Sequence, residues 1–467
     1  MSSSARLVLV LVGLPARGKS YISKKLYRWL NWIGVPTKIF NVGQYRREVV
    51  CGNDASEQFF DPNNEKALEI RAECAKRALR DLTLYLREPN SQVAIFDATN
   101  TSRSRRKLIL DMCKENEFDA FFIESMCDDE SILEANIKKI KLVSADYSNM
   151  SRSAARADFQ RRIDHYRSQY ETIDEAFEPV SFLKVFNAGR SFFVHDVSGN
   201  MKESKIVYYL MNIHLMPRVM YFTRHGECEY NRMFRLGGDS PLSDRGNKYT
   251  RKLFEYFERE GVRVTKIWSS QKIRSAQMAA AMRPLAPCVE YWKCLDEIDA
   301  GFCEGLTYED VGRKYPQQVE SRDKDKFNFR YPSGESYADV VTRLEPLIME
   351  LERQTDVLVI SHQAVLRCIL GYIFDHPQDK IPYIQVPLHC LIKLTPIAYG
   401  CKMETIKFDV EAVDTHRPKP RAATLAITHS PPTSAESSSS LSTDSTLSSS
   451  TICQDSLPSS PIFKMSL

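Results

Sequence analysis

One short motif near the start of the chain constrains the fold of its first half. Residues Gly13–Ser20 read Gly-Leu-Pro-Ala-Arg-Gly-Lys-Ser, which matches the phosphate-binding P-loop pattern G-x-x-x-x-G-K-[ST]. The apolar run Leu7–Val12 predicts a buried strand before the motif, and Tyr21–Leu30 predicts a helix after it. Glycines let backbone N–H groups approach phosphate oxygens, and the helix N-terminus adds partial positive charge. The motif therefore predicts a nucleotide-phosphate site at the edge of an α/β sheet.

Two side chains of this motif have direct roles in phosphate chemistry. Lys19 reaches the β- and γ-phosphates of a bound nucleotide, and the Ser20 hydroxyl is suited to Mg²⁺. The alternative, a chance glycine-containing turn, leaves the flanking strand and helix unexplained. Switch proteins and motors also use a P-loop, but no guanine-recognition NKxD motif stands in the expected place. A short domain with basic loops favours phosphoryl transfer to a small molecule.

Composition narrows the class of protein. The 467 residues are enough for two or three domains, and a net charge of only +4 gives no case for nucleic-acid binding. The 12 cysteines lack C-x-x-C pairs, which argues against a zinc site or a disulfide scaffold and fits a reducing compartment. No secretory signal is visible, and the apolar stretch Ile206–Met211 is too short to span a bilayer. We therefore expect a cytoplasmic protein that binds no membrane.

Further strands of the first half end in residues suited to anions or a metal. The expected strand Thr37–Val42 leads to Arg46, a candidate for a phosphorylated acceptor, although a solvated turn explains Arg46 equally well. Val93–Asp97 ends in a carboxylate, as a Walker B strand does. Residues 98–106 are rich in hydroxyls and guanidiniums, which suits a loop that binds anions. A fourth strand, Phe121–Cys127, ends in a cysteine whose residue context indicates a buried structural thiol.

A second chemistry begins after residue 215. A hydrophobic strand leads into Arg224-His225-Gly-Glu, another arginine, Arg274, follows the Trp268 strand, and Val357–His362 is a strand that ends in histidine. Clustered carboxylates occupy Leu295–Gly301. Histidine can accept a phosphoryl group, arginines neutralise its oxygens, and a carboxylic acid can protonate the leaving alcohol. A lone histidine is usually structural, but these four features together favour a phosphate site.

The order of motifs up to about residue 417 resembles the 6-phosphofructo-2-kinase/fructose-2,6-bisphosphatase family. The motifs are GLPARGKS, FNVGQYRRE, FDATNTSRSRR, IVYYLMNIH, RHGE, DEIDAG, YPSGESY and SHQAVLRC. RHGE alone indicates only the histidine-phosphatase superfamily, whereas its union with this P-loop half indicates the bifunctional enzymes. The resemblance implies two α/β domains, each a mostly parallel sheet flanked by helices, the second phosphoglycerate-mutase-like. The expected boundaries are 1–215 for the kinase, 216–415 for the phosphatase and 416–467 for a disordered Ser/Pro-rich tail.

The resemblance implies synthesis of fructose 2,6-bisphosphate from fructose 6-phosphate and ATP with Mg²⁺, and its hydrolysis through a phosphohistidine. For the kinase it implies active-site roles for Asp97 and Cys127, and Ser20 with Asp97 as Mg²⁺ ligands. The implied nucleotide-binding residues are Gly13, Leu14, Pro15, Ala16, Arg17, Gly18, Lys19, Ser20, Tyr21, Asn136, Lys141 and Tyr399. The implied fructose 6-phosphate residues are Arg46, Arg71, Thr99, Arg105, Lys141, Arg162 and Tyr166.

For the phosphatase the resemblance implies His225 as nucleophile, Glu297 as proton donor and His362 as a further catalytic residue. The implied fructose 2,6-bisphosphate residues are Arg224, Asn231, Gly237, Arg274, Tyr308, Arg322, Lys326, Tyr337, Gln363 and Arg367. A homodimer is expected from the resemblance alone. Because the first strand begins almost at once, we expect no N-terminal phosphorylation control. Ser430-Pro and Ser460-Pro are candidate sites for proline-directed kinases, although a passive tail explains them equally well.

Two other functions remain to be distinguished from this one. The same fold can retain only one significant activity, or it can serve as a non-catalytic nucleotide-binding regulator. The second alternative predicts loss of Lys19, Asp97, His225 or Glu297, and all four are present.

Overall fold

The structure is a computed structural model, and it describes residues 6–49, 57–61, 63–137, 151–197, 201–213, 218–397 and 400–420. Two predicted site residues, Lys141 and Tyr399, lie outside these ranges, as do the tail from 421 onward and most of the basic helix expected from Asn136. The chain up to Pro420 groups into one compact unit. None of the helices in the described ranges is both long and apolar enough to cross a bilayer.

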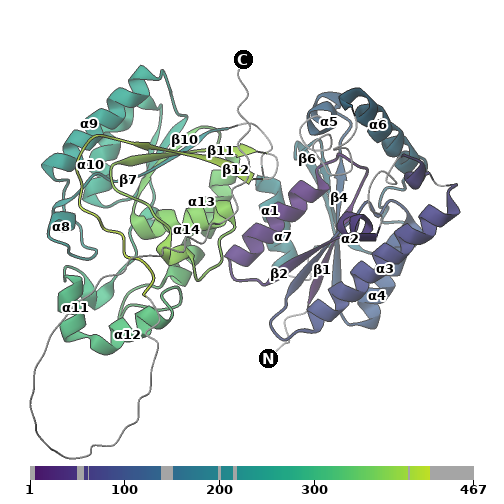
Figure 1. Cartoon of the computed structure of the whole chain (residues 1–467), viewed down its shortest axis with the longest axis horizontal. Coiled ribbons are helices and arrows are strands. Elements are labelled where there is room, and N and C mark those ends of the chain that lie inside the picture. The colour runs from purple at the N-terminus through teal and green to yellow at the C-terminus, as the bar shows by residue number, and fades with distance from the viewer. Residues whose placement is uncertain are drawn as a thin grey trace, which may run out of the picture. The chain divides into compact units, whose positions relative to one another are not determined.

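The first half alternates strands and helices, as the sequence predicts (Figure 1). Its elements are β1 (Leu7–Val12), α1 (Lys19–Trp32), β2 (Thr37–Asn41), α2 (Val42–Val49), the 3₁₀ helix η2 (Glu57–Phe60), α3 (Glu65–Arg87), β3 (Val93–Asp97), α4 (Arg103–Glu115), β4 (Asp119–Met126), α5 (Glu130–Asn136), α6 (Arg152–Ser168), β5 (Ser181–Phe186), β6 (Ser191–His195) and α7 (Met201–Asn212).

These strands form a six-stranded sheet in the order β2-β3-β1-β4-β5-β6, with only β6 antiparallel to its neighbour. All six side chains of β1 are fully buried, because helices cover both faces of the sheet. Alternate β1 residues pack against α1 and α7 on one face and against α3 and α4 on the other (Figure 1). Parallel strands end at a common edge, so the P-loop after β1, Asp97 of β3 and Ser125 of β4 share that edge.

The second half has the same kind of architecture. Its elements are β7 (Met220–Arg224), α8 (Glu229–Arg232), α9 (Asp244–Arg259), β8 (Lys266–Ser269), α10 (Ile273–Met282), β9 (Val289–Tyr291), α11 (Tyr308–Lys314), α12 (Pro316–Lys324), α13 (Tyr337–Arg353), β10 (Val357–Ser361), α14 (Gln363–Phe374), β11 (Cys390–Ile397) and β12 (Gly400–Lys407), with short 3₁₀ turns between some of them.

This second sheet has the order β12-β11-β7-β10-β8-β9, in which β7, β10, β8 and β9 are parallel and β11 and β12 form an antiparallel edge. Helices α9 and α10 cover one face, and α13 and α14 cover the other (Figure 1). Arg224, the last residue of β7, pairs with Ser361, the last residue of β10. The residues that follow, His225 and His362, therefore leave the same edge of the sheet side by side.

Most expected strands are confirmed, and two details differ. Strand β2 ends at Asn41, and Val42 begins helix α2, so Arg46 lies in a helix. Arg46 is only 4% exposed because Phe59 and Phe60 of η2 pack against its guanidinium, so the solvated-turn alternative is wrong. Strand β4 ends at Met126, and Cys127 follows it.

Helix α1, which begins at the P-loop, also packs on helix α14 of the second half. Trp32 donates its indole N–H to the Cys368 carbonyl at 2.9 Å, and Lys25 Nζ lies 2.6 Å from Glu352 Oε1. Arg218 Nη2 donates to the other Glu352 oxygen at 2.7 Å. Burial alone would raise the pKa of Glu352, but Lys25 and Arg218 bring that pKa down to about 2. A buried, compensated carboxylate therefore joins α1 to α13.

Two candidate active sites

The P-loop is held in shape by contacts to neighbouring strands and helices. Gly13 has a φ of 132°, and a Cβ there would collide with the Ser125 carbonyl, so only glycine fits. The Ser125 hydroxyl donates to the Arg17 carbonyl, and Asn136 Nδ2 donates to the Ala16 carbonyl at 3.0 Å. These contacts leave the N-terminus of α1 directed at the space where phosphates would lie.

Charged and polar groups gather around this loop. Lys19 is buried and its Nζ donates to the Leu14 carbonyl at 2.7 Å. Asp97, at the end of the strand beside β1, accepts a hydrogen bond from Asn41 Nδ2 on its Oδ2 at 2.6 Å. The Ser20 hydroxyl and Asp97 Oδ1 are the kind of oxygen ligands that Mg²⁺ takes together with nucleotide phosphates and water. The donor set therefore fits a nucleotide-bound Mg²⁺.

Three of the predicted sugar-phosphate residues meet around one aromatic ring. The Arg162 guanidinium stacks on Phe60 at 3.8 Å, Arg46 lies 5.3 Å from the same ring centre, and the Tyr166 ring lies 6.0 Å away. Arg71 Nη2, on α3, is buried and has no hydrogen-bond partner among the described residues. These residues form a cationic lining around η2.

Two other predicted acceptor residues come from the loop after β3. The Thr99 carbonyl accepts the N–H of Gly13 at 2.9 Å, which ties this loop to the P-loop. Burial lowers the pKa of Arg105, and the charge interaction with Tyr166 opposes that shift. Tyr166 also lies 6.0 Å from Phe60, so the contacts around η2 join residues of α2 and α6.

Two predicted nucleotide-site side chains, Tyr21 and Arg17, turn elsewhere, and the predicted active-site residue Cys127 is buried. The Tyr21 ring lies beside Lys25, and burial followed by Glu352 raises its pKa, so this side chain faces α13 rather than the phosphates. Arg17 Nη1 donates back to the Pro15 carbonyl at 3.2 Å. Burial raises the pKa of the Cys127 thiol, so Cys127 is a neutral thiol.

The second candidate site is built on two adjacent histidines. His225 is buried, and its Nδ1 lies 2.6 Å from the Gly226 carbonyl, so this nitrogen carries the hydrogen. Its Nε2 then has a free lone pair, which accepts the Arg274 Nε–H at 3.1 Å. Burial, and then Arg274 and Arg224, lower the pKa of His225 well below its usual range. His225 is therefore a neutral imidazole whose nucleophilic nitrogen faces a guanidinium.

His362 completes the group. Its ring centre lies 5.0 Å from that of His225, and its Nε2 lies 2.6 Å from the Ser270 hydroxyl. Arg274 Nη2 lies 3.3 Å from His362 Nδ1, so one guanidinium contacts both rings. Burial and then Arg274 lower the pKa of His362 well below its usual range. Two neutral imidazole rings thus contact the same guanidinium, that of Arg274.

A second arginine and a carboxyl group lie next to them. Arg224 Nη1 donates to the Val386 carbonyl and the Thr415 hydroxyl, while its buried Nε has no hydrogen-bond partner among the described residues. Burial lowers the pKa of Arg224 to about 10, so it remains charged at neutral pH. Glu297 Oε1 accepts the N–H groups of Ile298 and Ala364, and Oε2 accepts that of Gln363, so the start of α14 holds this carboxyl group.

The remaining predicted residues divide into two groups. Asn231 Oδ1 accepts the Cys228 N–H at 3.1 Å and so caps α8. Gly237 has a φ of 56°, and a Cβ there would collide with the Glu304 carboxylate, which also accepts the Gly238 N–H. These residues shape the loop whose Gly238 carbonyl accepts Arg274 Nη1 at 2.9 Å.

The other group is a cluster of cationic side chains and tyrosines. Arg367 Nη1 donates to the Tyr337 hydroxyl at 3.1 Å, and Arg322 Nε donates to the Tyr331 hydroxyl at 3.2 Å. Lys326 is buried, and burial, Arg322 and Arg367 lower its pKa to about 6. The Arg322 guanidinium also lies 5.4 Å from the ring centre of Tyr308. This cluster concentrates positive charge that an anionic ligand would neutralise.

The segment just before Pro420 contributes contacts that the sequence analysis did not predict. The Thr415 hydroxyl accepts from Arg224, His416 Nδ1 lies 3.4 Å from Arg367 Nη2, and the Arg417 guanidinium stacks on Tyr308 at 3.4 Å. Residues from 416 onward were assigned to a disordered tail from the sequence alone, so His416 and Arg417 were not expected at a site. The position of this segment at the site follows from β12, which returns the chain there, and not from any local motif.

Comparison with known proteins decides the family. Family models match residues 1–217 as 6-phosphofructo-2-kinase and residues 220–409 as histidine phosphatase superfamily (branch 1). A 6-phosphofructo-2-kinase/fructose-2,6-bisphosphatase from Caenorhabditis elegans is 55% identical over 87% of this chain and 90% of its own length. The chain belongs to this family. Isoform 3 from Rattus norvegicus is 51% identical over 90% of this chain and 75% of its own length, and isoform 1 from Homo sapiens is 50% identical over 88% and 87%.

Membership in the 6-phosphofructo-2-kinase/fructose-2,6-bisphosphatase family matches the two sites described above. The chain carries both a kinase domain and a histidine-phosphatase domain. The expected fold class, two α/β domains with mostly parallel sheets, is confirmed. The roles of individual residues stay predictions, which the geometry now makes specific.

Proposed function

We propose that this chain transfers the γ-phosphoryl group of ATP to the 2-hydroxyl of fructose 6-phosphate at one site, and hydrolyses fructose 2,6-bisphosphate at the other. One observation supports this most strongly: a single chain holds a P-loop that carries Lys19, with Asp97 at the end of the neighbouring strand, and a neutral His225 whose Nε2 faces Arg274. A protein that kept only one activity would have lost some of the kinase-site residues or some of the phosphatase-site residues.

The kinase site works by positioning and by electrostatic stabilisation. Backbone N–H groups of the P-loop and the N-terminus of α1 hold the phosphates, and Lys19 leaves the Leu14 carbonyl to neutralise charge that develops on the γ-phosphoryl oxygens. The cationic lining around η2, with Arg46, Arg71 and Arg162, binds the sugar 6-phosphate together with Arg105 of α4. Mg²⁺ held by Ser20 and Asp97 would supply further neutralisation of phosphate charge when bound.

The phosphatase reaction begins at His225. Its Nε2 lone pair attacks the 2-phosphoryl phosphorus, the bond from phosphorus to the fructose 2-oxygen breaks, and that oxygen takes a proton from Glu297. Arg274 and Arg224 would donate hydrogen bonds to the phosphoryl oxygens, and His362, whose Nδ1 accepts from Arg274, would hold that guanidinium in place. The Arg224 Nε, which has no hydrogen-bond partner among the described residues, is one N–H group available for a phosphoryl oxygen.

Glu297 is arranged to carry that proton. Its Oε1 accepts two backbone N–H groups, as the carbonyl oxygen of a carboxylic acid can, while Oε2 accepts only one and has capacity for a hydrogen. After the first step the ionised Glu297 accepts a proton from water, and the resulting hydroxide equivalent attacks the phosphohistidine. The bond between nitrogen and phosphorus breaks, phosphate leaves, and His225 is again neutral.

Other parts of the proposal rest on the family. We place the domain boundaries at 1–215 and 216–415, and we propose a cytoplasmic homodimer. His416 and Arg417, which were expected in the disordered tail, instead contact Arg367 and Tyr308 of the second site. Sedimentation of the purified protein tests the dimer, and fractionation of cells tests the location.

The experiment that tests the function measures both activities on one purified preparation. The proposal predicts ATP-dependent formation of fructose 2,6-bisphosphate and, without ATP, its hydrolysis with a transient acid-labile phosphoryl group. A preparation with only one activity would favour the monofunctional alternative. A preparation with neither, but with bound nucleotide, would favour the non-catalytic regulator.

Replacement of Arg274 by serine separates the two reactions. We expect phosphatase kcat/KM to fall by about 10²–10³-fold, because the guanidinium contacts both histidines and acts on the charged transition state. The kinase rate should stay near its original value, so net fructose 2,6-bisphosphate rises. Steady-state assays of both reactions measure this, with the exposed Arg263→Ser as matched control. An unchanged phosphatase kcat/KM would remove Arg274 from the mechanism.

Lys326 predicts a pH-dependent step in binding. Its pKa of about 6 leaves it largely neutral at pH 7, and a bound phosphate favours the charged form. Binding of fructose 2,6-bisphosphate should therefore take up a proton at pH 7 and strengthen as the pH falls from 8 toward 6. Calorimetry on the His225→Ala protein, in two buffers with different ionisation enthalpies, measures the uptake.

The matched variants for this test are Lys326→Met and the exposed Lys324→Met. The proton uptake should disappear in the first and persist in the second. Equal uptake in both variants would show that the proton goes to another group, such as the ligand phosphate.

A further inference from the structure

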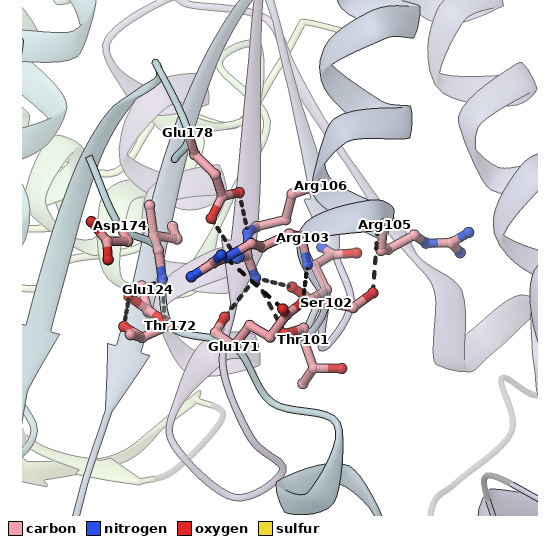
Figure 2. Close-up of polar contacts among 12 residues, drawn as sticks. Thr101, Ser102, Arg103, Arg105, Arg106, Glu124, Glu171, Thr172, Asp174 and Glu178 are labelled. Atoms are coloured by element: carbon pink, nitrogen blue, oxygen red, sulfur yellow. Dashed lines mark hydrogen bonds and ion pairs between the residues drawn. The ribbon is translucent and has the colours of Figure 1, made fainter. Parts of the chain in front are cut away.

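A buried arginine lies directly beside the proposed acceptor site and faces away from it. Arg106 is 1% exposed, and its Nε and Nη2 donate to the two Glu178 carboxylate oxygens at 2.7 and 2.6 Å. Its Nη1 donates to the carbonyls of Asn100, Thr101 and Glu171 at 3.1, 3.3 and 2.8 Å (Figure 2). All three guanidinium nitrogens are thus engaged by the protein itself.

Arg106 joins two segments that are distant in the sequence. One is the acceptor loop, which we define as residues 98–102 between β3 and α4, and the other is the clamp segment, residues 170–178 after α6. The Glu171 N–H also donates to the Thr101 carbonyl at 2.8 Å, and the Glu171 carboxylate accepts the Arg103 N–H at 2.7 Å. The two segments are therefore joined by a backbone hydrogen bond, and Arg106 donates to carbonyls of both.

Each segment adjoins elements that carry residues of the proposed acceptor site. The acceptor loop holds Thr99 and leads into Arg105, and its Asn100 Nδ2 also donates to the Leu11 carbonyl at 2.7 Å. The clamp segment follows α6, the helix that carries Arg162 and Tyr166. A shift between the segments would therefore change the spacing between Arg105 on α4 and Arg162 and Tyr166 on α6.

The far side of the clamp segment is anchored in the sheet. Glu124 of β4 is fully buried, and its carboxylate accepts the hydroxyls of Tyr170 and Thr172 at 2.5 and 3.0 Å. It also accepts the Ile173 N–H, and Lys184 Nζ lies 3.5 Å from it (Figure 2 shows Glu124 and Thr172). The clamp segment is thus fixed to β4 at one end and to Arg106 at the other.

Two adjacent arginines therefore have opposite orientations. Figure 2 shows the Arg105 side chain pointing away from the cluster around Arg106. Among the described residues, Arg106 forms an ion pair with Glu178, whereas none is found for Arg105. The charge of Arg106 is compensated within the protein, and the charge of Arg105 remains for a ligand.

We propose that Arg106, through Glu178 and the carbonyls of the acceptor loop and the clamp segment, is a positioning residue that sets the distance between the α4 and α6 residues of the fructose 6-phosphate site. This inference rests on the proposed function, because it takes that site from it. A guanidinium is required, since lysine offers a single point charge and lacks the planar fork that binds a carboxylate and flanking carbonyls at once. Small misplacements of binding groups cost about 10²-fold in rate when they amount to about 1 Å.

The test is a kinetic comparison of Arg106→Lys and Glu178→Gln with the original chain. We expect the KM for fructose 6-phosphate to rise by about tenfold or more in both. The KM for ATP should change by less, because the P-loop keeps its contacts with Ser125 and Asn136. The two substitutions act on one ion pair, so the double variant should raise the KM no further than the stronger single one. Phosphatase kcat/KM, measured on the same preparations, should remain unchanged. This measurement is the control for correct folding of each variant.

Lys107→Met is the matched control, because Lys107 follows Arg106 directly in helix α4 and its side chain is exposed. It should leave the KM for fructose 6-phosphate unchanged. A lower melting temperature with unchanged KM in both Arg106→Lys and Glu178→Gln would overturn the proposal and leave Arg106 a purely structural residue. If Arg106→Lys does not fold, Glu178→Gln alone decides, because it keeps the shape of the side chain and the carbonyl contacts of Arg106.

A further variant, Arg105→Ala, distinguishes failure of this inference from failure of the proposed function. A raised KM for fructose 6-phosphate in Arg105→Ala, with no change in the Arg106 and Glu178 variants, would overturn the positioning role only. No change in Arg105→Ala, with a raised KM in the other two, would overturn the assignment of Arg105 and support the positioning of the loop.

Discussion

Replacement of His225 by alanine is expected to abolish phosphatase turnover, with a loss in kcat of at least about 10⁴-fold, as for removal of other covalent nucleophiles. The reason is geometric as well as chemical. His225 Nδ1 is committed to the Gly226 carbonyl, so Nε2 is the nitrogen that faces Arg274 and the phosphoryl group. Burial keeps the ring neutral and the lone pair available at physiological pH. The variant should also lose acid-labile labelling from fructose 2,6-bisphosphate that carries ³²P at position 2.

The kinase reaction provides the control for this variant, together with the exposed His376→Ala, which should retain both activities. The His225→Ala protein should synthesise fructose 2,6-bisphosphate at the original rate and accumulate it. Persistent acid-labile label would show that another residue carries the phosphoryl group. His362 would then be the first candidate, since its ring lies beside that of His225 and is neutral for the same reason.

Replacement of Lys19 by methionine is expected to produce the opposite phenotype. Methionine has a similar length and fits the buried stem of the lysine, but it removes the ammonium group that would neutralise the transferring phosphoryl group. Kinase kcat should fall by about 10³-fold. Phosphatase kcat/KM should stay within about twofold, because distant sites without shared partners behave independently. Assays of both reactions on one preparation measure the two effects.

Lys24→Met is the matched control, because Lys24 lies on the same helix and is exposed. It should leave kinase kcat near its original value. Loss of both activities in a folded Lys19→Met protein would contradict the separation of the two sites. Unchanged kinase kcat in the Lys19→Met protein would show that the phosphoryl charge is neutralised without the ammonium group of Lys19.

The sequence predicted the elements that repeat a local physical pattern. The buried strand Leu7–Val12, the P-loop geometry and the histidines after β7 and β10 follow from apolar runs that end in polar residues at one sheet edge. Such a pattern predicts which residues leave the same edge. It does not predict the ring orientation of His225, which depends on the Gly226 carbonyl and on Arg274 from a separate helix.

Other features depended on contacts between distant segments. Arg46 could not be assigned from the sequence, because its burial depends on η2 folding over α2. The guanidinium-rich stretch 98–106 was interpreted as a single anion-binding loop, yet Arg106 turns inward to Glu178, 72 positions later. Tyr21 lies next to the P-loop in the chain, but helical geometry turns its ring toward α13. In each case periodicity gave the element, and only tertiary packing gave the direction of the side chain.

Helix α1 contacts both halves of the chain. Its first turn faces the nucleotide site, while Lys25 and Trp32 further along are buried against Glu352 and α14, the helix whose first turn holds Glu297. A cut between the halves would uncover the indole of Trp32, and Glu352 would lose Lys25 but keep Arg218 as its counter-charge. The two chemistries can thus be switched off one residue at a time, whereas such a cut would remove contacts that hold α1 and α14 together.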